Sequence, residues 1–130
     1  MEQRVSFKVY YEDTDSLGVV YYANYFKFME RGRSEFLSGE GRSIADWNAA
    51  GFALVVHSVQ ATFKRPAVLG DTVDVVTTLR MQSVYRGRFH QRIERAGEVL
   101  VEGDVDVVCL NQDNSLIEFP PEIADFAERP

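Results

Sequence analysis

Three carboxylates stand together just before a glycine, where a strand pattern gives way to a helix pattern. They are Glu12, Asp13 and Asp15, and Gly18 after them is the residue best able to take a positive φ. The helix pattern begins near Tyr22, and a helix N-terminus presents unpaired backbone N–H groups and a partial positive charge. A carboxylate can act as base or nucleophile, and N–H groups can hold an oxyanion. The sequence therefore predicts a base and an oxyanion site in one turn.

The elements on either side of this turn are a strand and a long helix. Val5, Phe7 and Val9 alternate with polar residues and predict a half-buried strand. After the turn, apolar side chains recur at helical spacing, at Tyr22, Tyr25, Phe26, Met29, Phe36 and Leu37. A second, short helix is predicted over 43–50, with Ser43 as its N-cap and Gly51 as its stop.

The second half of the chain is rich in strand patterns. Segments 52–64, 72–82, 85–95 and 98–110 alternate or carry many β-branched and aromatic residues, and Ala96-Gly97 predicts a tight hairpin. In the last segment one face is expected to hold Val99, Val101, Val105, Val107 and Cys109, and the other Glu102, Asp104 and Asp106. One strand, two helices and four strands predict an α+β fold with an antiparallel sheet.

Length and composition limit the possible classes of protein. The 130 residues predict one domain, 1–130, with a single core. We expect a cytoplasmic location, because the chain has no apolar run of membrane-spanning length and no signal-peptide pattern. A net charge of −6 argues against general binding to nucleic acid or anionic membranes. The single cysteine, Cys109, lies in an apolar strand pattern, so a catalytic thiol is the minor interpretation.

A longer motif surrounds the turn. The motif resembles the signature of hotdog-fold acyl-CoA thioesterases. It consists of the run DSLGVVYYANY at 15–25, Glu30 and Arg33 on the helix, and RPA and GD within 65–71. Within these, the chain is similar to the 4-hydroxybenzoyl-CoA thioesterase family and its YbgC-like branch, over nearly its whole length. The resemblance implies a five-stranded antiparallel sheet wrapped around one long helix, with clefts at a protomer interface. Many YbgC-like members have histidine where Tyr22 stands, so no role of that histidine transfers.

The resemblance also implies roles for individual residues. Asp15 is expected to be the nucleophile or general base, and the backbone N–H of Tyr22 the oxyanion donor, with N–H groups beside Gly18 assisting. Taken alone, an aspartate before a helix is more often a cap or turn residue, but the full motif favours catalysis. Asn24 is expected either to orient the acyl group or to bond the backbone. Tyr25 is expected to serve both core and substrate pocket.

Coenzyme A would bring phosphates to an acidic protein. The resemblance favours Lys64, Arg65 and Arg86 as their partners. Arg86 belongs to a row with Arg88, His90 and Arg92 on one strand face, and a solvated face of paired charges is an equally weighted alternative for that row. Coenzyme A is part of the substrate, so no cofactor is expected, and no cysteine or histidine cluster predicts a metal.

Other interpretations remain open. Glu30 or Glu35 on the helix could be the base instead, and an acyl carrier protein could replace coenzyme A. A non-catalytic acyl-binding module would tolerate loss of Asp15, whereas a hotdog hydratase would need a histidine-aspartate pair, and no histidine lies near the helix. Short-chain, branched and aryl acyl groups fit the sequence equally. The resemblance implies pairing through 52–64, so at least a homodimer is expected, with a homotetramer favoured.

Overall fold

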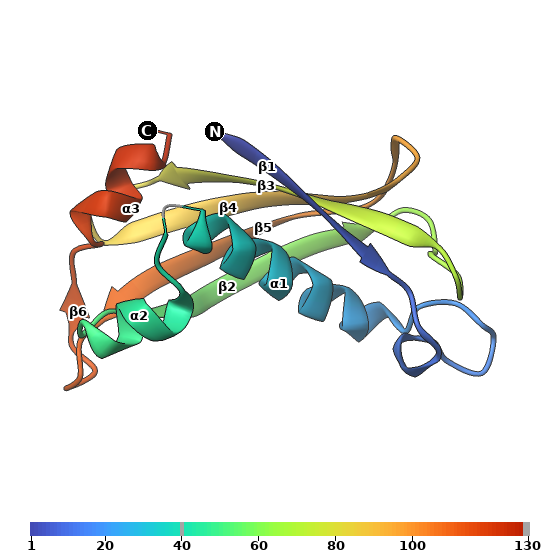
Figure 1. The fold of residues 1–130 in the computed structure, drawn as a ribbon, viewed down its shortest axis with the longest axis horizontal. Coiled ribbons are helices and arrows are strands. Elements are labelled where there is room, and N and C mark those ends of the chain that lie inside the picture. Colours follow the sequence, from blue (N-terminus) through green and yellow to red (C-terminus); the bar gives the residue numbers. More distant parts are fainter. Residues whose placement is uncertain (40, 129–130) are drawn as a thin grey trace.

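The structure, a computed structural model, describes residues 1–39 and 41–128. A curved antiparallel sheet packs against one long helix (Figure 1). The helices are α1 (Tyr25–Ser38), α2 (Ile44–Ala49) and α3 (Pro121–Phe126). The strands are β1 (Glu2–Lys8), β2 (Ala53–Phe63), β3 (Thr72–Met81), β4 (Arg86–Arg95), β5 (Glu98–Leu110) and β6 (Leu116–Ile117).

The strand order across the sheet is β1-β3-β4-β5-β2, and every pairing is antiparallel. Strand β6 extends the sheet by two residues beside β5 and was not predicted. The long strands agree with the predicted segments to within one residue at each end. The expected α+β fold, an antiparallel sheet around one long helix, is therefore confirmed.

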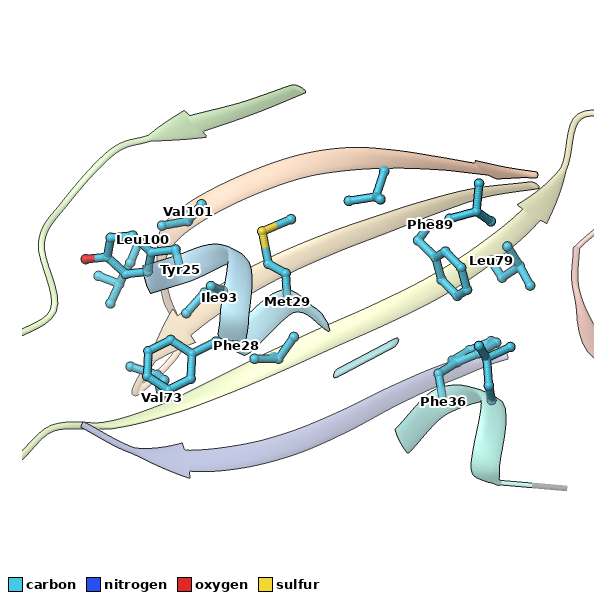
Figure 2. Close-up of a cluster of buried hydrophobic side chains, with 14 of the residues drawn as sticks. Tyr25, Phe28, Met29, Phe36, Val73, Leu79, Phe89, Ile93, Leu100 and Val101 are labelled. Atoms are coloured by element: carbon cyan, nitrogen blue, oxygen red, sulfur yellow. The ribbon is translucent and has the colours of Figure 1, made fainter. Parts of the chain in front are cut away.

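Helix α1 buries one stripe of side chains against the sheet. Figure 2 shows Phe28, Met29 and Phe36 of this helix among the core residues of the strands, and the ring of Phe36 meets that of Phe89 edge-on at 5.8 Å. At Gly32 an added Cβ would lie 2.5 Å from a side-chain carbon of the sheet, so the helix approaches closely only because this residue is glycine.

The predicted helix face needs one correction. Phe26 is 37% exposed, whereas Phe28, which was not assigned to the buried face, is 1% exposed. Successive helix residues are about 100° apart, so Phe26 turns away from the stripe that Tyr25 and Met29 occupy. Tyr22 is also exposed, because it lies in a 3-10 turn before α1.

Strand β5 differs from the predicted alternation at one point. Ile93 pairs with Val101, but the next residue of β4 pairs with Val99, so Leu100 is left over as a bulge. Leu100 is fully buried and Val99 only half-buried. The prediction that Val99 shares the buried face of Val101 is therefore wrong, because the bulge shifts the phase of the strand.

Local signals in the two connecting regions are confirmed. The hydroxyl of Ser43 accepts the N–H of Asp46 at 3.1 Å, and the Asp46 carboxylate accepts the N–H of Ser43 at 2.9 Å, so α2 has a capping box. Ala96 and Gly97 both take positive φ, 49° and 84°, as a two-residue hairpin requires.

Candidate active site

Two short turns between β1 and α1 carry the predicted acidic residues, at one end of the sheet (Figure 1). Glu12 and Asp13 lie in a 3-10 turn, Tyr11–Asp13, and Asp15 lies in the small hairpin that follows it. Thr14 pairs with Val20 across this hairpin. Gly18 has the predicted positive φ, 78°, and its N–H donates to the carbonyl of Asp15 at 3.1 Å. The N–H of Val20 donates to the carbonyl of Ala67 at 2.9 Å, which ties the hairpin to the turn after β2.

Asp15 lies exposed on this hairpin. Its carboxylate accepts one hydrogen bond, from the N–H of Leu17 at 2.8 Å, and its own N–H donates to Val19 at 2.9 Å. No cation among residues 1–39 and 41–128 forms an ion pair with this carboxylate. The turn thus orients Asp15 through one oxygen and leaves its charge available to accept a proton or attack carbon.

Asp13 and Asn24 hold the hairpin against the start of the helix. Asp13 is 3% exposed, and its carboxylate accepts the N–H of Tyr10 at 2.9 Å. Its carbonyl accepts the N–H of Tyr21 at 3.1 Å and the side-chain amide of Asn24 at 3.0 Å. Of the two roles expected for Asn24, the structure contains the bond to the backbone.

Tyr22 opens the helical segment. It is the first residue of a 3-10 turn, Tyr22–Asn24, that leads directly into α1. Within the described part of the chain, no acceptor bonds to the N–H of Tyr22 or of Ala23. Such unpaired donors are characteristic of a first helical turn and form a natural site for negative charge.

A cavity of about 220 Å³ lies beside Tyr22. Its lining residues are Val20, Tyr22, Tyr25, Phe63, Lys64, Arg65 and Pro66. Tyr25 is 3% exposed, and its hydroxyl accepts the N–H of Ala67 at 2.9 Å. Burial raises the pKa of Tyr25, and the hydrogen bond from Ala67 offsets part of this rise. The structure therefore brings together four predicted residues, Tyr22, Tyr25, Lys64 and Arg65.

Phe63 was missed by the sequence reasoning. Phe63 fits the strand pattern of 52–64 and has no feature that sets it apart from other strand residues. Only its position directly before Lys64 and Arg65 could have indicated that it belongs to the site.

Lys64 and Arg65 each meet a carboxylate at the surface. The Lys64 ammonium lies 3.1 Å from Glu102, and the Arg65 guanidinium lies 3.2 Å from Glu98. Exposed pairs of this kind are weak, because both partners keep much of their hydration. Both cations can therefore turn to a phosphate at little cost.

Arg86 lies far from these two cations within one chain. In the sheet register, Arg86 is opposite Val108, whereas Phe63, the neighbour of Lys64, is opposite Val101. The seven steps from residue 101 to residue 108 span roughly 23 Å of strand. Arg86 forms no ion pair with any described residue. The three predicted phosphate partners thus form two separate groups.

The row of cations beyond Arg86 is paired. The guanidinium of Arg88 binds both oxygens of Asp106, at 2.7 and 3.1 Å, and holds the pKa of that carboxyl below its ordinary value. His90 lies between Asp104 at 2.9 Å and Glu102 at 3.0 Å. For these residues the interpretation as a paired, solvated sheet face fits better than a phosphate site.

The carboxylates of α1 lie elsewhere. Glu30 accepts the hydroxyl of Ser34 at 2.8 Å and lines a separate hollow of about 150 Å³ between α1 and β2. Glu35 is exposed on the helix. Neither residue lines the cavity that contains Tyr22.

A reactive thiol, a metal site and a membrane-spanning helix would each suggest a different kind of protein. Cys109 is fully buried, and burial raises the pKa of its thiol to about 11, so its nucleophilic thiolate is scarce at neutral pH. No group of three histidine, cysteine, aspartate or glutamate side chains within 1–39 and 41–128 is arranged to hold a metal ion. None of the helices in those ranges is long and apolar enough to cross a membrane.

Known proteins are similar to this chain in sequence and in fold. Residues 9–126 match the model of the thioesterase-like superfamily. The chain is 39% identical over 108 residues to the acyl-CoA thioester hydrolase YbgC of Escherichia coli O157:H7, covering 80% of this chain and 78% of that protein. It is 45% identical over 73 residues to the acyl-CoA thioesterase YbgC of Helicobacter pylori, covering 56% of this chain and 53% of that protein, about half its length.

A crystal structure of a probable thioesterase from Bartonella henselae superposes with a TM-score of 0.88 and 30% identity, covering 92% of this chain and 100% of that one. The chain therefore belongs to the thioesterase-like superfamily. The predicted resemblance to the YbgC-like branch and the hotdog fold are both confirmed.

Proposed function

We propose that this protein is an acyl-CoA thioesterase, which hydrolyses a thioester to a free acid and coenzyme A. The names of its relatives support this activity. The observation that carries the proposal is the turn itself. The unpaired carboxylate of Asp15 and the unpaired N–H of Tyr22 occur on one short connection, and Tyr22 lines a cavity.

The chemistry uses these two groups in either of two ways. As a general base, Asp15 takes a proton from water while the water oxygen bonds to the thioester carbon. As a nucleophile, Asp15 bonds to that carbon itself, and water then hydrolyses the resulting anhydride. In both routes the Tyr22 N–H stabilises the negative carbonyl oxygen, and the carbon–sulfur bond breaks. The thiolate of coenzyme A leaves and takes up a proton.

The cavity and the cations give the substrate its orientation. In this arrangement the acyl group lies against Tyr25, and the nucleotide end extends toward Lys64 and Arg65, on the rim of the same cavity. Their exposed partners, Glu102 and Glu98, leave them free to exchange a carboxylate for a phosphate.

We further propose that two copies pair through β2. This strand of 11 residues is an edge of the sheet, and Val55, Val56 and Val59 are each at least 40% exposed. A long, apolar edge strand of this kind is a template for pairing with another chain. Antiparallel pairing about a two-fold axis would bring Arg86 of the second protomer toward Lys64 of the first. A homodimer would thus unite the two groups of cations, and a homotetramer is the expected larger assembly.

A panel of thioesters tests the activity. Purified protein should release free thiol from short, long or aryl acyl-CoA, or from the matching acyl carrier protein esters. Binding of acyl-CoA without thiol release would instead identify a non-catalytic module. Hydration of an enoyl-CoA without thiol release would identify a hydratase.

Light scattering tests the assembly. Val56→Lys places a charge at the middle of β2 and should yield monomers with little activity. Leu116→Lys changes a residue of similar exposure on β6 and should leave the oligomer intact. A wild-type monomer at micromolar concentration would refute pairing through β2.

A further inference from the structure

Phe63, at the end of β2, lies among three other aromatic rings. Its ring centroid is 5.8 Å from that of Tyr22, 5.8 Å from that of Tyr25 and 6.1 Å from that of Phe26. The contacts with Tyr22 and Phe26 are edge-on, an arrangement that aromatic pairs favour. Phe63 is nevertheless 43% exposed, so its ring is held in place by its neighbours at the surface rather than enclosed in the core.

The cavity beside Tyr22 has fixed walls and one exposed aromatic boundary. Val20 and Tyr25 are each less than 5% exposed, and the Tyr25 hydroxyl is bonded to the backbone of Ala67. Phe63 and Tyr22 are the exposed rings of the lining. The other exposed lining residues are Lys64, Arg65 and Pro66, on the side proposed for coenzyme A, so an acyl group that extends away from them must displace or pass an exposed ring.

The volume of the cavity indicates the size of its ligand. A cavity of about 150 Å³ is enough to bind benzene. The cavity here, about 220 Å³, has room for one substituted ring or a short or branched chain, and an extended long chain would reach beyond its rim.

We propose that Phe63 sets the upper size of the acyl group, so that the preferred substrates are short, branched or single-ring acyl thioesters. This inference rests on the proposed thioesterase function. Tyr22 links the role of Phe63 to the proposed catalysis, because the Tyr22 N–H is the proposed oxyanion donor and the Tyr22 side chain lines the cavity together with Phe63. A carbonyl held at that N–H therefore has its acyl substituent next to the cavity.

The test compares kcat/KM across a series of straight-chain acyl-CoA esters from acetyl to palmitoyl, together with benzoyl-CoA. For the wild type, kcat/KM should rise by roughly fourfold for each methylene that the cavity buries and then fall beyond the short esters. Phe63→Ala should raise the decanoyl-to-butyryl ratio of kcat/KM about tenfold or more, because it removes the ring at the boundary. Phe63→Trp should lower the same ratio.

Phe26→Ala is the matched control. Phe26 is an exposed aromatic residue that touches Phe63, but it does not line the cavity. Its loss should leave the order of substrate preference unchanged. Phe63→Leu guards against misfolding of the alanine variant, and circular dichroism and light scattering establish that each variant keeps its fold and assembly.

The outcomes separate the two proposals. If the wild type cleaves thioesters but the Phe63 variants keep its size profile, the role of Phe63 is refuted and the thioesterase function stands. A wild type that prefers long chains refutes the size limit in the same way. If the wild type cleaves no ester in the series, the proposed function itself is wrong, and the inference about Phe63 is overturned with it.

Discussion

The outer face of the sheet and the turn before α1 use the same side-chain types in opposite ways. On the sheet, the carboxylate of Asp106 is bound through both oxygens by Arg88, and Glu94 is bound by Arg92 at 2.9 Å. On the turn, no described cation pairs with Asp15, and a single backbone N–H orients it. The carboxylate of Asp106 is thus committed to a partner strand, whereas the carboxylate of Asp15 has no competing cation among the described residues.

The difference follows from the backbone on which each carboxylate stands. Neighbouring strands in register place side chains opposite each other, and Arg88 is directly opposite Asp106 in the β4–β5 pairing. A tight hairpin such as the one that carries Asp15 satisfies its polar groups with its own N–H groups. Strand register therefore accounts for the ion pair of Asp106, and the hydrogen bonding within its own hairpin accounts for the orientation of Asp15 without a cation.

The largest expected effect is the loss of turnover when the negative charge of Asp15 is removed. Asp15→Asn keeps the size of the side chain and its bond from Leu17, so folding should survive. Turnover of an acyl-CoA ester should fall ~10²-fold or more with little change in substrate binding, because general-base or nucleophilic assistance is lost. Steady-state kinetics measures turnover and the Michaelis constant, and a thermal melt measures whether the fold survives.

Asp13→Asn is the control for that variant, because Asp13 is buried and bonded to the turn. It should affect stability more than the chemical step. If Asp15→Asn remained active while Glu30→Gln or Glu35→Gln was inactive, the helical glutamate would be the base, and Asp15 would have only a structural role.

The next largest effect is expected on substrate binding, from replacing Arg86, which forms no ion pair with any described residue. Arg86→Ala should raise the Michaelis constant for acyl-CoA about tenfold, because the loss of one charge-assisted hydrogen bond weakens binding by about that factor. A truncated thioester that lacks the nucleotide should be affected much less. Arg88→Gln, two residues along the same strand face, should leave both constants near wild type because Arg88 is already paired. Equal losses on both substrates would assign Arg86 a structural role instead.

A smaller effect is expected from breaking a pair on the sheet. Asp106→Asn should lower the melting temperature by about 5 °C and leave kcat near wild type, because Arg88 loses a carboxylate partner while remaining partly hydrated. Asp113→Asn, in an exposed turn, should leave the melting temperature unchanged. An unchanged melting temperature for both variants would show that the pair contributes nothing to stability.

The smallest effect is a dependence of stability on pH. Arg88 lowers the pKa of Asp106, and Arg92 is the first cause of the lowered pKa of Glu94. A carboxyl whose folded pKa is below its unfolded value of about 4 stabilises the fold fully above that value. This contribution is lost as the pH falls through the folded pKa. Urea unfolding between pH 7 and pH 3 should show the decline, and Asp106→Asn should make it shallower.

The local structure and the motif could be predicted from the sequence. Alternation of period two located the long strands to within one residue at each end, since the pattern depends only on which face is buried. The capping box of Ser43 and the hairpin at Ala96-Gly97 follow from neighbouring residues alone. The motif from Asp15 to Tyr25 identified the family and the turn, because the chemistry proposed there depends on residues close together in the chain.

Contacts between residues far apart in the sequence could not be predicted, because they depend on how the strands and α1 pack. The pairing of β2 with β5, across nearly fifty residues of sequence, places Phe63 beside Tyr22 and separates Lys64 from Arg86 by most of a strand. The bulge at Leu100 is likewise a property of two strands in register, and no alternation within β5 reveals it. An alternating pattern specifies which face of a strand is buried, but it does not specify which other strand lies beside that strand. That choice is made by the packing of the whole sheet against α1.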